Sequence, residues 1–436
     1  MEYKKKGSDP KKWGLTPFIE LVAPAGDWPS LYAAMEAGTN SVYFGVKELN
    51  MRHEATNFDL LEIKKIVEEL HTKGCKGYLT VNTLIMEGEQ AKLKRIFKQA
   101  SAAKVDAVIL WDAAALSMAK EYGLAVHLST QASVANIDAV SFYADQGVKR
   151  IVLARECTLK DIIDIAKEIQ KRKMACALEV FIHGAMCVSI SGRCFLSELS
   201  FDKSANRGEC LQPCRREFYI RDVEEERAPV SDDDVPSKTR GEDEAEYILG
   251  KDYVLSPKDL CTMDFIDELM ESGVAAFKIE GRMRSPEYIR VVVGAYRKAM
   301  DAFAQGKLTV KLKSELKKEL ATVYNRGFSS GFYFGTPTNK DISKGLGHTH
   351  EKVYLGEVKK FYKNLLVADI RVRNGVLKKG DTLLFIGRST PALEAQAGEM
   401  QANHIFVDVA PKGTAVGVKL PFIVRPKDKV FLWKEK

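Results

Sequence analysis

The sequence predicts an α/β protein: a (β/α)8 barrel of the TIM type with a cysteine-rich insertion, followed by a small C-terminal all-β barrel. Between residues 16 and 340, eight short apolar runs alternate with helix-length amphipathic stretches. Eight such units suit a closed parallel barrel. The alternation is interrupted at residues 184–273, between the seventh and eighth runs, and beyond residue 350 short β-type runs are separated by Gly-containing turns.

The expected barrel strands are short, apolar and rich in β-branched residues. They lie at residues 19–25, 41–46, 77–81, 107–111, 125–128, 150–154, 178–182 and 275–280. Stretches between them, such as DLLEIKKIVEELHTKG and LKDIIDIAKEIQKRK, have apolar residues at i, i+3, i+4 and i+7, which is typical of amphipathic helices. Residues 290–305 predict the closing helix and residues 311–323 another. A doubly wound sheet is the alternative, but no G-x-G-x-x-G follows the first run.

We expect the chain to consist of three parts that differ in charge. Residues 1–15 form a basic tail, residues 16–340 the catalytic domain with its insertion, and residues 350–436 the C-terminal barrel. Residues 222–246 hold eleven acidic and three basic side chains, which is typical of a solvated loop. Residues 340–436 hold eighteen Lys and Arg against ten Asp and Glu. This basic excess predicts an RNA-binding surface, with a merely solubilising surface as the alternative.

Four cysteines, Cys187, Cys194, Cys210 and Cys214, fall within 28 residues of the insertion. The sequence shows no signal peptide and no apolar run of membrane-spanning length, so we expect a cytoplasmic protein without a membrane partner, in which thiols stay reduced. Clustered thiols then indicate metal ligation. The gaps of six, fifteen and three residues favour an iron–sulfur cluster over the paired knuckles of zinc sites, and Cys261 is a fifth candidate ligand. Three other cysteines are expected to be buried apolar residues: Cys75, Cys157 and Cys176.

Charged residues alternate with apolar ones on the last two barrel strands. Period-two alternation directs Glu179 and His183 into the barrel, and Lys278, Glu280 and Arg282 inward or upward. Charges inside a barrel are costly unless they are paired or used. We therefore expect these five residues to form a site for a small anionic molecule, with a purely structural ion network as the alternative.

Other polar residues are weaker candidates. Asn82, Gln131 and Arg155 lie at or just beyond the carboxyl ends of predicted strands, and His127 is expected to be a core residue. Residues 327–331 match G-x-S-x-G, but a nucleophile elbow requires a strand before it and a helix after it, and the sequence has neither there.

Several of these motifs together resemble the collagenase-like peptidase family U32. They are E-x-F-x2-G-A-M-C-x4-G-x-C at 179–194, N-R-G-E-C-x3-C-R at 206–215, LSPKDLC at 255–261, FKIEGRM at 277–283 and ELVAPAGD at 20–27. With its C-terminal barrel, the chain is most similar to the branch that hydroxylates the wobble uridine of tRNA to 5-hydroxyuridine with prephenate as cosubstrate. The resemblance implies a 4Fe-4S cluster on Cys187, Cys194, Cys210 and Cys261, whereas spacing alone prefers Cys214 as the fourth ligand.

Rival functions come from other classes. The first is a collagenase-like peptidase, although the sequence shows no nucleophile–base pair, metal-ligand pair or paired carboxylates at convincing spacing. The others are an iron–sulfur hydroxylase acting on ubiquinone precursors or rRNA, and a non-catalytic RNA-binding module. The expected partners are tRNA and a small anionic cosubstrate. Whether a paralogous partner chain is needed is left open.

Overall fold

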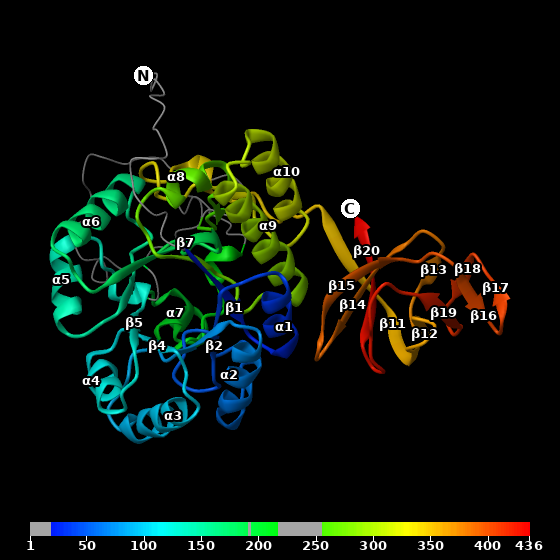
Figure 1. Cartoon of the computed structure of the whole chain (residues 1–436), viewed down its shortest axis with the longest axis horizontal. Helices are drawn as coiled ribbons and strands as arrows, with labels where there is room; N and C mark the ends of the chain where they lie inside the picture. Colours follow the sequence, from blue (N-terminus) through cyan, green and yellow to red (C-terminus); the bar gives the residue numbers. More distant parts are fainter. Residues whose placement is uncertain (1–18, 191–192, 217–254) are drawn as a thin grey trace, which may run out of the picture.

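The computed structural model describes residues 19–190, 193–216 and 255–436. The predicted basic tail and the acidic segment 222–246 lie outside these residues. In the described part the chain forms an eight-stranded parallel barrel with surrounding helices and, to one side of it, an antiparallel β domain (Figure 1).

The barrel strands occur at all eight predicted positions. They are β1 (Glu20–Ala25), β2 (Ser41–Gly45), β3 (Lys76–Thr80), β4 (Ala107–Leu110), β5 (Val126–Leu128), β6 (Arg150–Val152), β7 (Ala177–Gly184) and β9 (Ala276–Ile279). Each strand pairs in parallel with the next, and β9 pairs with both β7 and β1, which closes the ring. The side chains that face the helices form the main hydrophobic core.

The helices surround this ring in the order of the chain. They are α1 (Trp28–Glu36), α2 (Ile63–Thr72), α3 (Gln90–Ala102), α4 (Ala113–Glu121), α5 (Ile137–Asp145), α6 (Leu159–Lys171), α8 (Ile266–Met270), α9 (Pro286–Ala304) and α10 (Val310–Ala321). Five begin at residues whose side chains accept hydrogen bonds from the first-turn N–H groups: Asp27, Asp112, Asn136, Thr158 and Thr309. Such caps fix where each helix starts and therefore where each strand-to-helix loop ends.

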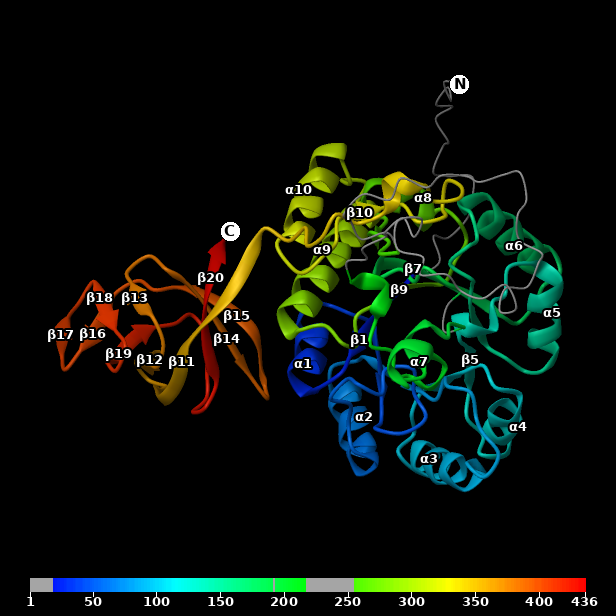
Figure 2. The same ribbon diagram turned by 180° about the vertical axis from the view of Figure 1, so that it is seen from behind.

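The insertion begins at the carboxyl end of β7 and crosses the mouth of the barrel. It contains α7 (Leu196–Phe201), which lies over the ring of strands in Figure 2, and β8 (Asp259–Cys261), which pairs antiparallel with the end of β7. Two contacts fix it to the opposite side of the mouth. Arg207 forms an ion pair with Glu89 at 2.6 Å, and the Gly208 carbonyl accepts a hydrogen bond from the His53 N–H at 3.0 Å.

Strand β7 contains a bulge, which makes one predicted side-chain orientation wrong. The register of β7 against β9 shifts between Phe181 and His183, so that His183, and not Ile182, lies opposite Ile279. Ile279 belongs to the core between the strands and the helices. The side chain of His183, which lies opposite Ile279, therefore also points towards the helices. The prediction that His183 faces the barrel interior is wrong, because a bulge reverses the alternation beyond it.

The C-terminal domain is an antiparallel β structure with its own core. Its strands are β11 (His350–Tyr362), β12 (Val367–Val372), β13 (Val376–Lys378), β14 (Thr382–Gly387), β15 (Thr390–Gln396), β16 (Met400–Ala402), β17 (Ile405–Phe406), β18 (Val409–Pro411), β19 (Ala415–Lys419) and β20 (Lys429–Glu435). It packs on the outside of the barrel near α1 and α9. Lys352 pairs with Glu287 at 2.7 Å there, and Arg290 donates to the Pro391 carbonyl at 3.2 Å.

Candidate functional site

The floor of the barrel interior is a buried ion network. Arg150 contacts Glu20 at 2.9 Å and Glu179 at 3.2 Å, and the Lys278 ammonium contacts Glu179 at 2.7 Å. The Tyr78 hydroxyl donates to Glu20. Burial acts to raise the pKa of Glu20, but Arg150 outweighs burial and holds that pKa at about 2. Glu20, Glu179 and Arg150 are therefore charged at neutral pH, because the pKa of each carboxyl is lowered and that of the guanidinium is raised.

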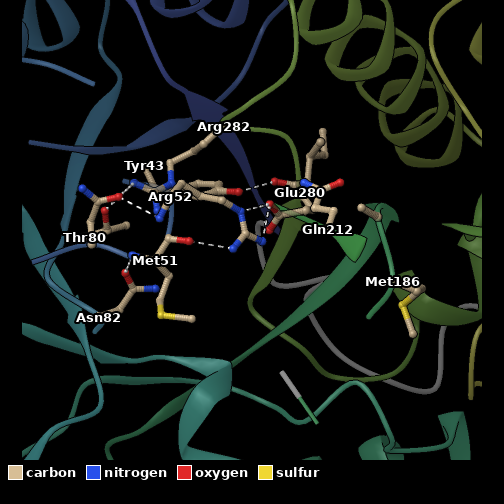
Figure 3. A network of polar contacts seen from close by, with 12 residues as sticks. Tyr43, Met51, Arg52, Thr80, Asn82, Met186, Gln212, Glu280 and Arg282 are labelled. Atoms are coloured by element: carbon tan, nitrogen blue, oxygen red, sulfur yellow. Dashed lines mark hydrogen bonds and ion pairs between the residues drawn. The ribbon is translucent and has the colours of Figure 1, made fainter. Parts of the chain in front are cut away.

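Above this floor a cleft opens at the carboxyl ends of the strands and holds about 560 Å³ of open space, part of it continuous with solvent. Its walls come from six of the eight barrel strands (β2, β3, β4, β6, β7 and β9), from the loops after β2, β3, β5, β6 and β9, and from the start of the insertion. The lining residues are Tyr43, Met51, Arg52, Thr80, Asn82, Ile109, Ser129, Thr130, Gln131, Val152, Arg155, Phe181, Cys187, Lys278, Glu280 and Arg282. Figure 3 shows the part built around Arg52, Glu280 and Arg282.

Arg282 enters the cleft from the segment after β9. Its Nη1 donates to Thr80 Oγ1 at 2.9 Å and to Asn50 Oδ1 at 3.1 Å (Figure 3). Gly45 makes this position available, because a Cβ there would collide with the guanidinium. Burial lowers the pKa of Arg282 to about 10, so the group remains a cation at neutral pH. Both hydrogen-bond acceptors are neutral, and the positive charge is left for another partner.

Glu280 is held between two arginines. Its carboxylate lies 3.0 Å from Arg52 Nη2 and 3.5 Å from Arg155 Nη2. Burial acts to raise its pKa, but Arg52 and Arg155 outweigh burial and lower that pKa to about 2. Arg155 also lies over the Phe181 ring at 4.1 Å and donates to the Ala185 carbonyl at 2.7 Å, while its buried Nε has no hydrogen-bond partner among the described residues.

The charges of floor and cleft do not cancel. The three carboxylates all have lowered pKa values and are ionised. Against these three stand five cations, which leaves two positive charges in the barrel interior without a countercharge among the described residues. The carboxylates are Glu20, Glu179 and Glu280; the cations are Arg52, Arg150, Arg155, Lys278 and Arg282. Uncompensated charge is costly in a desolvated site, so the arrangement is suited to binding a dianion.

The facing wall of the cleft is neutral and polar. Asn82 Nδ2 donates to Gln131 Oε1 at 3.4 Å, and the Ser129 hydroxyl donates to the same oxygen. Asn82 Oδ1 accepts from the Met51 N–H at 3.2 Å. Amide side chains provide both donors and acceptors, and are therefore suited to the edge of a heterocyclic base.

Four cysteines of the insertion lie near one another at the mouth. Burial raises the pKa of the Cys214 thiol, Arg215 opposes this, and the charges of Cys187, Cys210 and Cys194 raise it further. Cys187 lines the cleft. The insertion thus brings the Cys187 thiol to the cleft, with the other three sulfur donors close enough for their charges to act on one another.

Cys261 lies elsewhere. It is buried on the outer side of the sheet, where its Sγ accepts from the Tyr296 hydroxyl at 3.8 Å, and it pairs in register with His183. Burial raises the pKa of its thiol to about 11. The position favours Cys214, which the spacing prefers, over Cys261 as the partner of the other three thiols.

Four cysteine thiols are a donor set of the kind that holds iron–sulfur clusters. Among the described residues no group of three or more Cys, His, Asp or Glu is close enough to hold one metal ion. The corners of a four-iron cluster bind thiolates that are further apart than the ligands of a single ion. A half-buried cation lies beside the thiols: Arg215 Nε finds no hydrogen-bond partner in the described part of the chain, and Arg215 donates to the Met186 carbonyl at 3.4 Å. An anionic cluster would suit this cation.

Of the predicted site residues, the structure brings Lys278, Glu280 and Arg282 to the cleft and Glu179 to the floor beneath it. His183 lies outside, among Tyr288, Tyr296 and Phe328. Sequence reasoning missed Arg52 and Arg150. Arg52 follows β2, and a cation beyond the end of a barrel strand is a signal that could have found it.

Comparison with known proteins agrees with this architecture. The model of peptidase family U32 matches residues 26–343, and the chain belongs to that family. It is 40% identical over 426 residues to "Uncharacterized protease MJ0090" of Methanocaldococcus jannaschii, covering 96% of this chain and 98% of that one. It is 36% identical to a "Collagenase" of Porphyromonas gingivalis (95% and 97%), and 33% identical to "tRNA hydroxylation protein P1" of Bacillus subtilis (84% and 83%).

No helix in the described ranges is both long enough and apolar enough to cross a bilayer.

Proposed function

We propose that this protein hydroxylates the wobble uridine of tRNA to 5-hydroxyuridine, with prephenate as cosubstrate and a 4Fe-4S cluster on the insertion. The observation that carries the proposal is the surplus of two positive charges in the barrel interior, within a cleft that Cys187 also lines. Prephenate is a dicarboxylate and would neutralise that surplus. A relative that is 33% identical over 84% of this chain is named for tRNA hydroxylation.

Each wall of the cleft has a separate role in this proposal. Arg282 and Arg155 bind the carboxylates of prephenate, since a guanidinium presents parallel N–H groups to a carboxylate. Glu280 holds Arg52 and Arg155 in place and is not itself a base, because its pKa of about 2 leaves it a very weak proton acceptor. Asn82 and Gln131 hold the edge of an extruded uracil.

The thiols of Cys187, Cys194, Cys210 and Cys214 would hold the cluster at the mouth. When bound, such a cluster supplies one-electron transfer. The half-buried Arg215, which donates to the Met186 carbonyl next to Cys187, holds the two cysteine-bearing segments together.

A peptidase is the second candidate, because two relatives carry protease or collagenase names. The structure offers one Cys and one His near each other, with the Tyr296 hydroxyl 3.8 Å from Cys261 Sγ and 3.3 Å from His183 Nδ1. Cys261 is 4% exposed and His183 2% exposed. A peptide cannot reach a pair that is buried beneath α9, which favours the hydroxylase.

The test is mass spectrometry of tRNA nucleosides after incubation of purified protein with tRNA and prephenate, with a collagen digest in parallel. We expect 5-hydroxyuridine and no cleaved peptide. Arg282→Gln should raise KM for prephenate roughly 10- to 100-fold, because it removes a charge-assisted hydrogen bond, and leave the visible spectrum intact. The control is Arg95→Gln, whose arginine pairs with Glu48 at an exposed site and should change nothing. Unmodified tRNA together with cleaved collagen would overturn the proposal.

A further inference from the structure

The β11–β12 hairpin of the C-terminal domain forms one basic surface with the strands beside it. Tyr362 pairs with Val367, and Val367 pairs on its other side with Lys419, so these three side chains share one face. Lys429 lies opposite Glu357 on the other neighbouring strand, and the Lys427 N–H donates to the Val358 carbonyl at 2.8 Å. We call this the hairpin surface. Its exposed lysines are Lys359, Lys360, Lys363, Lys419, Lys427 and Lys429.

These six lysines differ from three other cations of the domain, which are ion-paired. None of them lies within ion-pairing distance of a carboxylate in the described part of the chain, although Asp369 is opposite Lys360 in the register. By contrast, Lys352 pairs with Glu287, Lys379 with Asp408 and Arg373 with Glu357. The hairpin surface therefore keeps an excess of positive charge, which favours an anionic partner.

Apolar side chains stand among these lysines. Tyr362 is 41% exposed, Leu365 65% and Leu366 39%, and the Lys360 ammonium lies 4.7 Å from the centre of the Tyr362 ring. A face that only improves solubility needs lysines but not an exposed tyrosine and two leucines. Aromatic rings next to cations are the common means of binding nucleic-acid bases and phosphates together.

We propose that the hairpin surface binds the RNA substrate, with its lysines on phosphates and Tyr362 stacked on a base. This inference rests on the proposed function, in which the substrate is tRNA. An anionic membrane would also attract lysines, but two leucines at a hairpin tip are a small apolar area compared with the amphipathic helices that insert into bilayers. None of the residues of the hairpin surface lines the barrel cleft, so this surface would hold the RNA while the cleft carries out the chemistry.

The test is a salt titration of binding to an unmodified tRNA transcript, with the full-length protein. A triple Lys→Gln variant of the hairpin surface is compared with a control that removes the same number of charges near β13 and β18. The test variant changes Lys359, Lys360 and Lys363; the control changes Lys378, Lys379 and Lys412, which are also exposed. A third variant, Tyr362→Ala, isolates the stacking contribution.

We expect the test variant to bind tRNA about tenfold more weakly at low salt. The slope of log affinity against log salt concentration should be shallower by roughly 2 to 3, because binding then neutralises fewer phosphates and releases fewer counterions. The control should keep the wild-type slope. Tyr362→Ala should weaken binding by about tenfold at every salt concentration, since stacking does not depend on counterions. Far-ultraviolet circular dichroism and unchanged thermal unfolding verify that each variant is folded.

Equal loss in the test and control variants would overturn the inference, because only net charge would then matter. So would tighter binding of the wild type to vesicles rich in phosphatidylserine than to tRNA. The two proposals fail separately. If the wild type leaves tRNA unmodified but binds it through the hairpin surface, the proposed hydroxylation is wrong and this inference stands. If the wild type modifies tRNA and the test variant does so with unchanged KM for tRNA, this inference is wrong.

Discussion

Cys214 and Cys261 are the two candidates for the fourth cluster ligand, and their thiols lie in different surroundings. Cys214 lies near three other cysteines at the mouth of the barrel, where burial raises the pKa of its thiol and the Arg215 cation opposes this effect. Cys261 is enclosed by the outer core, and burial raises its pKa to about 11. A thiol must lose its proton to bind iron, so the surroundings of Cys214 are better suited to ligation.

We therefore predict that Cys214→Ala, like Cys187→Ala, removes the brown colour of protein purified without oxygen, while Cys261→Ala keeps it. The measurement is visible absorption and iron content per chain. Cys75→Ala is the control, because this cysteine is buried beside α2 and remote from the insertion. A coloured Cys214→Ala protein and a colourless Cys261→Ala protein would instead support Cys261 as the fourth ligand.

For single residues, the sequence predicted which side chains face the barrel interior better than it predicted which residues they contact. Alternation correctly directed Lys278 into the barrel, because β9 is regular. It could not reveal that Glu179 would be shared between Lys278 and Arg150, since that contact joins strands that are distant in the sequence. The choice between Cys214 and Cys261 likewise depends on where β8 packs, which spacing does not encode.

Strand β7 shows, for a whole element, that a feature set by pairing with a distant strand cannot be predicted from the sequence. Residues 179–183 contain no glycine or proline that would indicate a bulge. The bulge becomes evident only in the pairing with β9. Gly184 follows the bulge with φ at +110°. Glycine is required at this position, because a Cβ there would lie 2.6 Å from the Glu280 carbonyl oxygen. The strand positions were thus predictable, whereas the orientation of the last residues of β7 was not.

The outward position of His183 leads to a prediction about pH. Burial is the main cause that lowers the pKa of His183, to about 4, from an ordinary 6.5. The unfolded chain takes up a proton below pH 6.5 and the folded chain does not until about pH 4. The free energy of unfolding is therefore highest above pH 6.5 and falls as the pH drops towards 4. From this residue alone we expect a loss of about 2 kcal/mol between pH 7 and pH 5.

The His183→Phe variant should lack this part of the pH dependence, and urea denaturation at pH 7 and pH 5 measures it. Phenylalanine keeps an aromatic ring among Tyr288, Tyr296 and Phe328, and the Tyr296 hydroxyl retains its bond to the Ile182 carbonyl at 2.9 Å. His127, whose pKa is also lowered, is present in both proteins and cancels in the comparison. Parallel pH dependences in wild type and variant would show that the pKa of His183 is not lowered in the folded protein.

The whole molecule combines two cores that are joined at a modest contact. The barrel core and the core of the C-terminal domain are separate clusters. The chain leading to the second domain is itself fixed to the barrel, since the Gly347 N–H donates to the Asn325 carbonyl at 2.9 Å and the Thr349 N–H to the Ala321 carbonyl at 3.0 Å. The sequence predicted both domains. It could not predict that the second would pack near α1 and α9, because that contact depends on isolated pairs such as Lys352 with Glu287.

This arrangement leads to a prediction for a protein truncated after Gly347. The barrel should fold and keep the visible spectrum of its cluster, because its core does not depend on the second domain. It should bind tRNA at least about tenfold more weakly, a loss of roughly 1.4 kcal/mol, and with a shallower salt slope, because the hairpin surface is gone. The loss should be at least as large as in the triple lysine variant, which removes only part of that surface. Filter binding across a salt series measures both. Equal affinity and slope in the truncated and full-length proteins would show that the barrel alone holds the RNA, and that the charge of the C-terminal domain serves solubility.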